Sequence, residues 1–223
     1  MRATLTALAL LLAMPVHAES DVTIENRPCC EDQRTIAALS PETALIASIS
    51  EQAVRMNSVL WLRLDGNRTA RLVDCIAYAC SVDSAGRHEL VAWWPKHRQY
   101  VIDVGLYEGR KAFLISERDG HLTPVFAPPI LSPSGRHVVA ANLAPGHGDG
   151  LQIIAMDTDP PTVLAVETRP ACPGNKPQLW LRPDPRWLDD TRIIFEGSLD
   201  PVQFDPDITH ILRIVDGKPE WEC

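Results

Sequence analysis

Residues 58–223 carry short apolar runs separated by turn residues, and this pattern constrains the fold more than any other feature of the chain. No stretch in this region keeps a helical period, so the pattern predicts antiparallel β-structure. Asp-Gly dipeptides stand between strand-forming runs at 65–66, 119–120 and 216–217. Because both residue types tolerate positive φ, we expect type I′ hairpins at these positions.

The apolar runs predict eight strands, at 59–64, 100–104, 112–116, 137–142, 151–156, 162–166, 192–195 and 210–215. Upstream of them, Ser40-Pro41-Glu42 resembles a helix N-cap followed by proline at the first helical position, which predicts a helix over 41–56. Ile46 and Ile49 are β-branched, so a strand remains the alternative for this segment.

A longer repeat organises the strands. The lines WPKHRQYVIDVGL, SPSGRHVVAANLA and WLDDTRIIFEGSL align when Pro95, Pro133 and Leu188 are superposed. A period of about 40 residues with several short strands per unit is typical of propeller-like repeats, in which each unit is a small antiparallel sheet. The units are too few for an ordinary closed propeller. We therefore expect a mainly β fold of propeller-like repeats, either a partial propeller or a curved stack of small sheets, with a short N-terminal helical segment.

The segments PILSPSGRHVVAA and PRWLDDTRIIFEG resemble the repeat lines of TolB-like and WD40-like β-propellers. The span from Glu89 to Glu196 is also similar to a group of uncharacterised proteobacterial secreted proteins. That group has no assigned activity, so the resemblance implies a fold and transfers no functional residue. Gly135 is kept from the repeat pattern, but Ser134 stands where the pattern prefers Asp.

The N-terminus has the pattern of a secretory signal peptide. Arg2 precedes an apolar run over 5–14, and Val16-His17-Ala18 forms a small-x-small cleavage site. The run is shorter than the roughly 20 residues that span a bilayer, and no later apolar segment reaches that length. We expect a periplasmic or secreted protein cleaved after Ala18, with no integral membrane segment. The mature chain then divides into an N-terminal segment, 19–57, and a β-repeat domain, 58–223.

All six cysteines lie after the predicted cleavage site: Cys29, Cys30, Cys75, Cys80, Cys172 and Cys223. An even number in an exported chain predicts disulfides. Adjacent cysteines rarely bridge each other, so Cys29 and Cys30 are expected to reach different partners, whereas Cys75 and Cys80 can form a local clip. A metal or redox site is the alternative, but no C-x-x-C pair exists and no histidine lies close to either pair. We expect no metal and no cofactor.

Two serines in ILSPSGRHVVAA raise the question of a nucleophile. Ser132 and Ser134 occupy positions that the next repeat fills with Trp187 and Asp189, and the segment lacks the G-x-S-x-G spacing of a nucleophile elbow. We predict that both are turn residues. The net charge of −8, without clusters of Lys and Arg, argues against a nucleic-acid partner.

Tryptophans are the most suggestive residues for binding, although most are expected to fill gaps between sheets. Trp93 and Trp94 are adjacent, so in a strand they face opposite sides, and one of them must leave the first core or enter a second interface. The sequence favours a non-enzymatic exported protein that binds another protein or a cell-envelope component, as a scaffold, inhibitor or immunity-type factor. The alternative is a periplasmic hydrolase that uses loop carboxylates such as Asp149, Glu196, Asp200 and Asp205.

Overall fold

The computed structural model describes residues 22–25, 40–74, 86–106, 109–142, 150–167, 185–196 and 209–222. The described chain contains one α-helix, α1 (Ser40–Ser48), and a short 3-10 helix at Asp65–Asn67. Its strands are β1 (Val22–Glu25), β2 (Ala53–Met56), β3 (Val59–Arg63), β4 (Thr69–Val73), β5 (Gly86–Trp94), β6 (Gln99–Leu106), β7 (Gly109–Ser116), β8 (Leu122–Val125), β9 (Ile130–Leu131), β10 (His137–Asn142), β11 (Gly150–Ala155), β12 (Thr162–Glu167), β13 (Arg186–Trp187), β14 (Arg192–Glu196), β15 (Thr209–Val215) and β16 (Lys218–Glu222). In the described part of the chain, no helix is long and apolar enough to cross a membrane.

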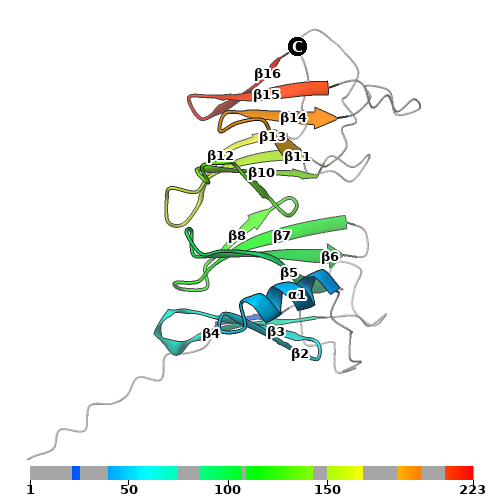
Figure 1. The fold of residues 1–223 in the computed structure, drawn as a ribbon, viewed down its shortest axis with the longest axis vertical. Coiled ribbons are helices and arrows are strands. Elements are labelled where there is room, and N and C mark those ends of the chain that lie inside the picture. Colours follow the sequence, from blue (N-terminus) through cyan, green and yellow to red (C-terminus); the bar gives the residue numbers. More distant parts are fainter. Residues whose placement is uncertain are drawn as a thin grey trace, which may run out of the picture.

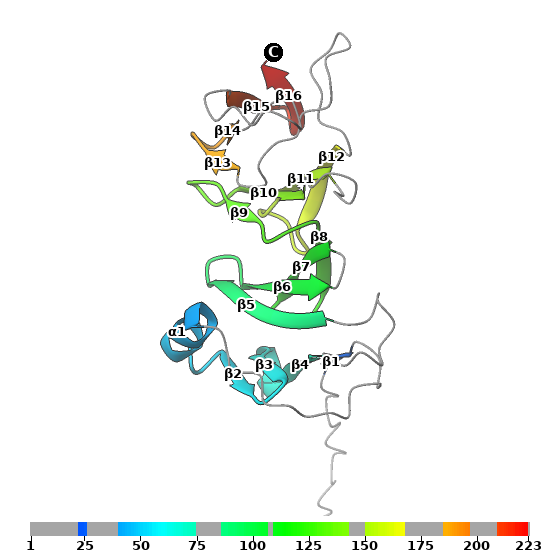
Figure 2. The ribbon, with the colours of Figure 1, turned by 90° about the vertical axis from the view of Figure 1, so that its right-hand side faces the viewer.

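The strands form four sheets of four strands each. The first sheet has the order β1-β4-β3-β2, and the second, third and fourth are the meanders β5–β8, β9–β12 and β13–β16. All pairings are antiparallel except that β1 lies parallel to β4. Figures 1 and 2 show the sheets stacked face to face along the long axis of the molecule, in chain order. The fold is therefore mainly β, as the sequence predicts, with one helix beside the first two sheets.

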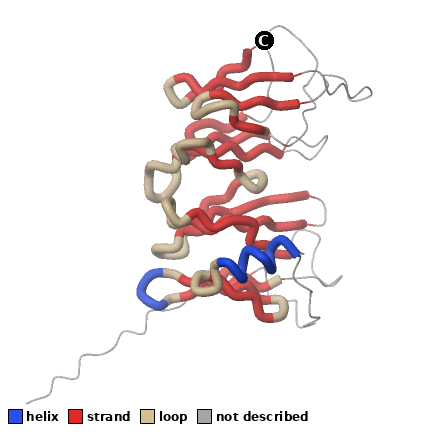
Figure 3. The backbone as a smooth tube through the Cα atoms, viewed as in Figure 1, coloured by secondary structure: helices blue, strands red, loops and turns tan. Residues whose placement is uncertain are grey.

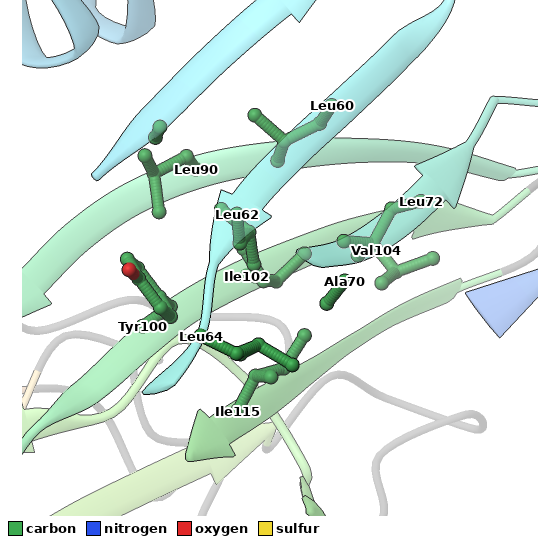
Figure 4. Close-up of a cluster of buried hydrophobic side chains, with 11 residues drawn as sticks. Leu60, Leu62, Leu64, Ala70, Leu72, Leu90, Tyr100, Ile102, Val104 and Ile115 are labelled. Carbon is green, nitrogen blue, oxygen red and sulfur yellow. The ribbon is translucent and has the colours of Figure 1, made fainter. Parts of the chain in front are cut away.

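An apolar core fills each of the three seams between neighbouring sheets. The first core lies between the first and second sheets and includes Leu60, Leu62 and Tyr100 (Figure 4). The second core joins the second and third sheets, and the third core joins the third and fourth. The alternation of buried and exposed residues along β3 and β15 follows the period of two that a strand imposes. Burying one such leucine contributes about 1.5–3 kcal/mol, so the seams hold the stack together.

A buried ionic cluster covers the edge of β5. Arg55 of β2 donates to both oxygens of Glu42 on α1 at 2.8 Å and to Asp74 Oδ2 at 2.8 Å. Glu42 accepts a hydrogen bond from the backbone N–H of Leu90, and Asp74 accepts one from the backbone N–H of His88, each at 2.8 Å. Arg55 also donates to His88 O. These backbone groups belong to the edge strand of the second sheet. The cluster therefore satisfies backbone groups that an edge strand would otherwise leave unpaired.

The structure tests the predicted elements directly. Each of the eight predicted strands overlaps an observed one, and all eight are confirmed. The helix predicted over 41–56 is wrong in its second half, because α1 ends at Ser48 and 53–56 forms β2. Ala53 and Arg55 face inward while Val54 and Met56 face outward, a period of two that suits a strand paired with β3. The division between 57 and 58 falls in the turn between these two strands of the first sheet.

The Asp-Gly hairpins are confirmed as turns, but only one has the expected backbone. Asp216 and Gly217 both have positive φ, 51° and 75°, as a type I′ turn requires. At 65–66 the positive φ values shift to Gly66 and Asn67 within the 3-10 helix. At 119–120 only Gly120 is positive, because the Asp119 carboxylate accepts the backbone N–H of His121 and holds a different turn.

Candidate binding surface

The aligned repeat turns meet along one edge of the stack. Pro95, Pro133 and Leu188 each lie in the turn between the first two strands of the second, third and fourth sheet, which confirms the alignment made from the sequence. Lys96 Nζ donates to Ser134 O at 3.0 Å, and Ser134 N donates to Asp190 Oδ1 at 2.7 Å. This backbone hydrogen bond lowers the pKa of Asp190. Hydrogen bonds thus link the turn of each of these sheets to the turn of the next sheet. Figure 3 draws the turns of the described chain in tan.

The same edge carries one ion pair between the first and second sheets and another within the second sheet. Arg98 contacts Asp65 and lies 3.6 Å from Glu117 Oε1. The hydrogen bond from Arg98 lowers the pKa of Asp65, and the same contact raises the pKa of Arg98. Because these side chains are partly exposed, the pairs contribute little to stability and mainly fix the positions of the turns.

His97 stands at the mouth of the seam between the second and third sheets. Its Nδ1 lies 3.3 Å from Met156 O. A carbonyl oxygen only accepts, so Nδ1 is the donor in this contact. Nε2 is buried and has no hydrogen-bond partner among the described residues. It lies so close to Gly135 that a Cβ at that position would stand 2.8 Å from it, which explains why this turn needs glycine.

An apolar hollow of about 260 Å³ opens on one side of His97. Trp94 at the end of β5 and Leu131 at the end of β9 line it, and both pack against the second core. Pro133 and Gly135 of the β9–β10 turn form its other wall. The hollow is therefore a continuation of the core that reaches the surface.

A polar hollow of about 100 Å³ lies on the other side of His97. Gln99 lines it and is only 3% exposed, yet its Oε1 has no hydrogen-bond partner in the described chain. Arg118 forms an ion pair with Asp159 at the rim, where Asp157 is exposed. Buried acceptors in native proteins are almost always satisfied, so an unpaired amide oxygen in a polar hollow indicates a place for a water or a ligand donor. We call the two hollows, together with His97, the seam groove.

The structure places the two candidate tryptophans in different seams. Trp93 packs against the first core, and its indole Nε1 is buried without a hydrogen-bond partner among the described residues. Trp94 packs against the second core and lines the seam groove. Because the first and third sheets cover the two faces of the second sheet, Trp94 enters a second interface instead of facing solvent.

The two serines are confirmed as turn residues. Ser132 is buried, and its Oγ accepts the backbone N–H of His137 at 3.2 Å. Ser134 Oγ accepts the backbone N–H of Arg136 at 3.3 Å. Both hydroxyl groups therefore stabilise the turn before β10.

Several predicted residues lie outside the part of the chain that the structure describes. These are all six cysteines, Cys29, Cys30, Cys75, Cys80, Cys172 and Cys223, and the loop carboxylates Asp149, Asp200 and Asp205. Glu196 ends β14, and its side chain is not described. Within the described ranges, no group of three or more His, Cys, Asp or Glu side chains is placed to hold a metal ion.

Comparison of the chain with protein-family models, with curated proteins and with solved structures gave no match. The seam groove therefore has to be interpreted from its own geometry. His97 and Gln99 were missed as site residues from the sequence, because only the packing of the third sheet shows that both face a hollow. The aligned repeat turns were the signal that could have found them, since these turns lie next to one another at every seam.

Proposed function

We propose that this protein is an exported, non-enzymatic β-repeat protein that binds another protein or a cell-envelope component through the seam groove. The four stacked sheets serve as a rigid scaffold of propeller-like repeats, and the turns that join them carry recognition. This division of roles is common in proteins whose loops are held by a β framework. The signal-peptide pattern supports the export part of the proposal.

The observation that carries the proposal is the pairing of an apolar hollow with a buried, unpartnered acceptor. Trp94 and Leu131 offer apolar surface in one hollow, and the polar hollow that shares Lys96 and His97 with it contains Gln99, whose Oε1 lacks a partner among the described residues. A ligand that places an apolar group against Trp94 and a hydrogen-bond donor at Gln99 satisfies both. Aromatic side chains in such hollows are typical anchors of protein interfaces.

The size of the hollows favours a segment of a larger partner over a free small molecule. Pockets for drug-sized ligands have volumes of about 300–1,000 Å³. The apolar hollow measures about 260 Å³ and the polar one about 100 Å³, and His97 stands between them. One apolar side chain and one neighbouring donor, such as a peptide N–H or a side-chain amide, fill this space. We therefore infer that the ligand is a short segment of a polypeptide.

The experiment is capture of partners by the immobilised mature protein from an extract of its own periplasm. The Trp94→Ala variant should lose the captured partner, because it removes the wall of the apolar hollow. Trp61→Ala is the matched control, since Trp61 is also half-buried but lies on the outer face of the first sheet, where it stacks on Arg71. Loss of the partner with Trp61→Ala and not with Trp94→Ala would move the site away from the seam groove. Turnover of an envelope substrate that depends on Asp157, which lines the polar hollow, would favour the hydrolase instead.

A further inference from the structure

The third sheet ends in a strand with exposed apolar side chains. β12 is the outer strand of the order β12-β11-β10-β9, and no described strand pairs with its other edge. Val163, Leu164 and Val166 on this strand are 41%, 37% and 50% exposed. An exposed edge strand presents a row of backbone donors and acceptors that another strand can use, and apolar side chains beside that row strengthen such pairing.

The corresponding strands of the neighbouring sheets are protected against such pairing. β8, with the sequence LTPV, contains Pro124, which cannot donate a backbone hydrogen bond. β16, with the sequence KPEWE, contains Pro219 and three charged residues. β12, with the sequence TVLAVE, has no proline and no lysine, and its one charged residue is Glu167 at the end. Of these three outer strands, only β12 lacks the residues that natural proteins use to block an edge.

A bulge is the one protective feature that β12 has. The register with β11 shifts between Ile153 and Ile154, so Leu164 has no opposite residue on β11. The register of β5 with β6 shifts in the same way at Val91, but the edge of β5 is also covered by the ionic cluster around Arg55. No comparable cover lies over β12 in the described residues. Among the described residues, only the bulge interrupts this edge.

We propose that β12 pairs edge to edge with β12 of a second copy of this chain, antiparallel about a two-fold axis. An axis between Leu164 and Ala165 places Val163 of each copy opposite Val166 of the other. Apolar cross-strand pairs of this kind stabilise an antiparallel sheet. The same register places Glu167 opposite Thr162 of the second copy, so no like charges meet. A parallel, in-register pairing would place Glu167 against Glu167, which favours the antiparallel arrangement.

The chemistry of the edge also favours a second copy as the occupant. A two-fold contact uses the same surface on both chains, and the sequence TVLAVE supplies matching apolar residues in both directions. The chain has a net charge of −8, which opposes close approach of two copies elsewhere on the surface, whereas this strand brings a single charge to the contact. A six-residue strand buries less area than a standard interface, so the dimer is weak and depends on concentration.

Sedimentation velocity of the mature protein from about 1 µM to about 1 mM tests the proposal over the range of weak complexes. The sedimentation coefficient should rise toward that of a dimer, and hydrogen exchange of the β12 backbone N–H groups should slow with increasing concentration. Val166→Lys should abolish both effects, because a lysine on the edge must lose its hydration when strands pair. Val54→Lys is the matched control, since Val54 is 44% exposed on β2 of the first sheet, and it should associate like the wild type.

A synthetic peptide with the sequence TVLAVE provides a readout that does not depend on a variant. It should compete with association and lower the sedimentation coefficient at high protein concentration. A wild-type chain that stays monomeric to about 1 mM would overturn the proposal. So would equal loss of association in both lysine variants, or association that leaves the exchange of β12 unchanged. Binding of the peptide by a chain that remains monomeric would assign the edge to a strand of another protein and also overturn the two-fold dimer.

Discussion

Removing the guanidinium group of Arg55 is expected to destabilise the protein strongly. Arg55 is hydrogen-bonded to Glu42 and Asp74, and all three side chains are almost completely buried. Burial alone would lower the pKa of Arg55, but the hydrogen bond with Glu42 and the charge of Asp74 outweigh it and raise that pKa. Arg55→Met keeps an unbranched apolar stem, removes the guanidinium group and leaves two buried carboxylates without their cation.

The magnitude follows from the cost of an uncompensated buried charge. Removing one partner of a buried ion pair costs about 3–5 kcal/mol. Both carboxylates keep one backbone donor, from Leu90 and His88, so we expect a loss near the middle of that range. The loss comes from the two negative charges, which remain buried without a cation. A variant that also carries Glu42→Gln and Asp74→Asn should recover part of the stability at neutral pH for the same reason.

Urea denaturation of the protein, followed by circular dichroism, gives the free energy of unfolding by linear extrapolation. Arg98→Met is the matched control, since Arg98 pairs with Asp65 at an exposed position and should lose little. A loss below about 1 kcal/mol for Arg55→Met, or a loss equal to that of Arg98→Met, would show that the two carboxylates do not depend on this cation. The cluster around Arg55 would then not be what covers the edge of β5.

Three further predictions concern a turn, a buried histidine and the cysteines. Gly135→Ala should lower the unfolding temperature more than Gly217→Ala does. Both positions have positive φ, but only at Gly135 would a Cβ stand 2.8 Å from His97 Nε2. Equal decreases in unfolding temperature would contradict this close approach. Burial lowers the pKa of His210 below its ordinary 6.5, so the neutral form is favoured in the folded state, and the free energy of unfolding should fall as the pH drops through 6.5 toward the folded pKa. His210→Phe should remove that part of the pH dependence, and an unchanged profile would count against burial as the cause. Titration of the unreduced, denatured mature protein with a thiol reagent should find close to no free cysteine, whereas six free thiols would exclude the predicted disulfides.

The periodic parts of the fold could be predicted from the sequence, and the contacts between sheets could not. The eight strands predicted from the apolar runs and the repeated turns all occur among the sixteen described strands, because strand patterns are local and recur. The helix was extended over Ala53–Met56 because Ala, Arg and Met suit a helix, and only pairing with β3 makes this segment a strand. Tertiary pairing here outweighed local propensity.

The candidate site shows the same limit. The alternation of a strand was enough to predict that Trp93 and Trp94 face opposite sides. It could not show that a sheet covers each side, which depends on how the second and third sheets stack. Gln99 looks like an ordinary polar residue next to a turn, and only the packing of the third sheet shows that it lines one hollow with Met156 and the β11–β12 connection. The role of the seam groove thus follows from packing and not from any motif.

The affinity of the captured partner for wild-type protein and for two groove variants tests whether the partner binds in the seam groove. Trp94→Ala should weaken binding by about 2 kcal/mol or more, which is roughly 30-fold in the dissociation constant. Gln99→Met should also weaken binding, because the buried acceptor of the polar hollow is lost. Trp61→Ala should bind like the wild type. All three variants should keep the wild-type circular-dichroism spectrum. Wild-type affinity in both Trp94→Ala and Gln99→Met would show that the partner does not bind in the seam groove.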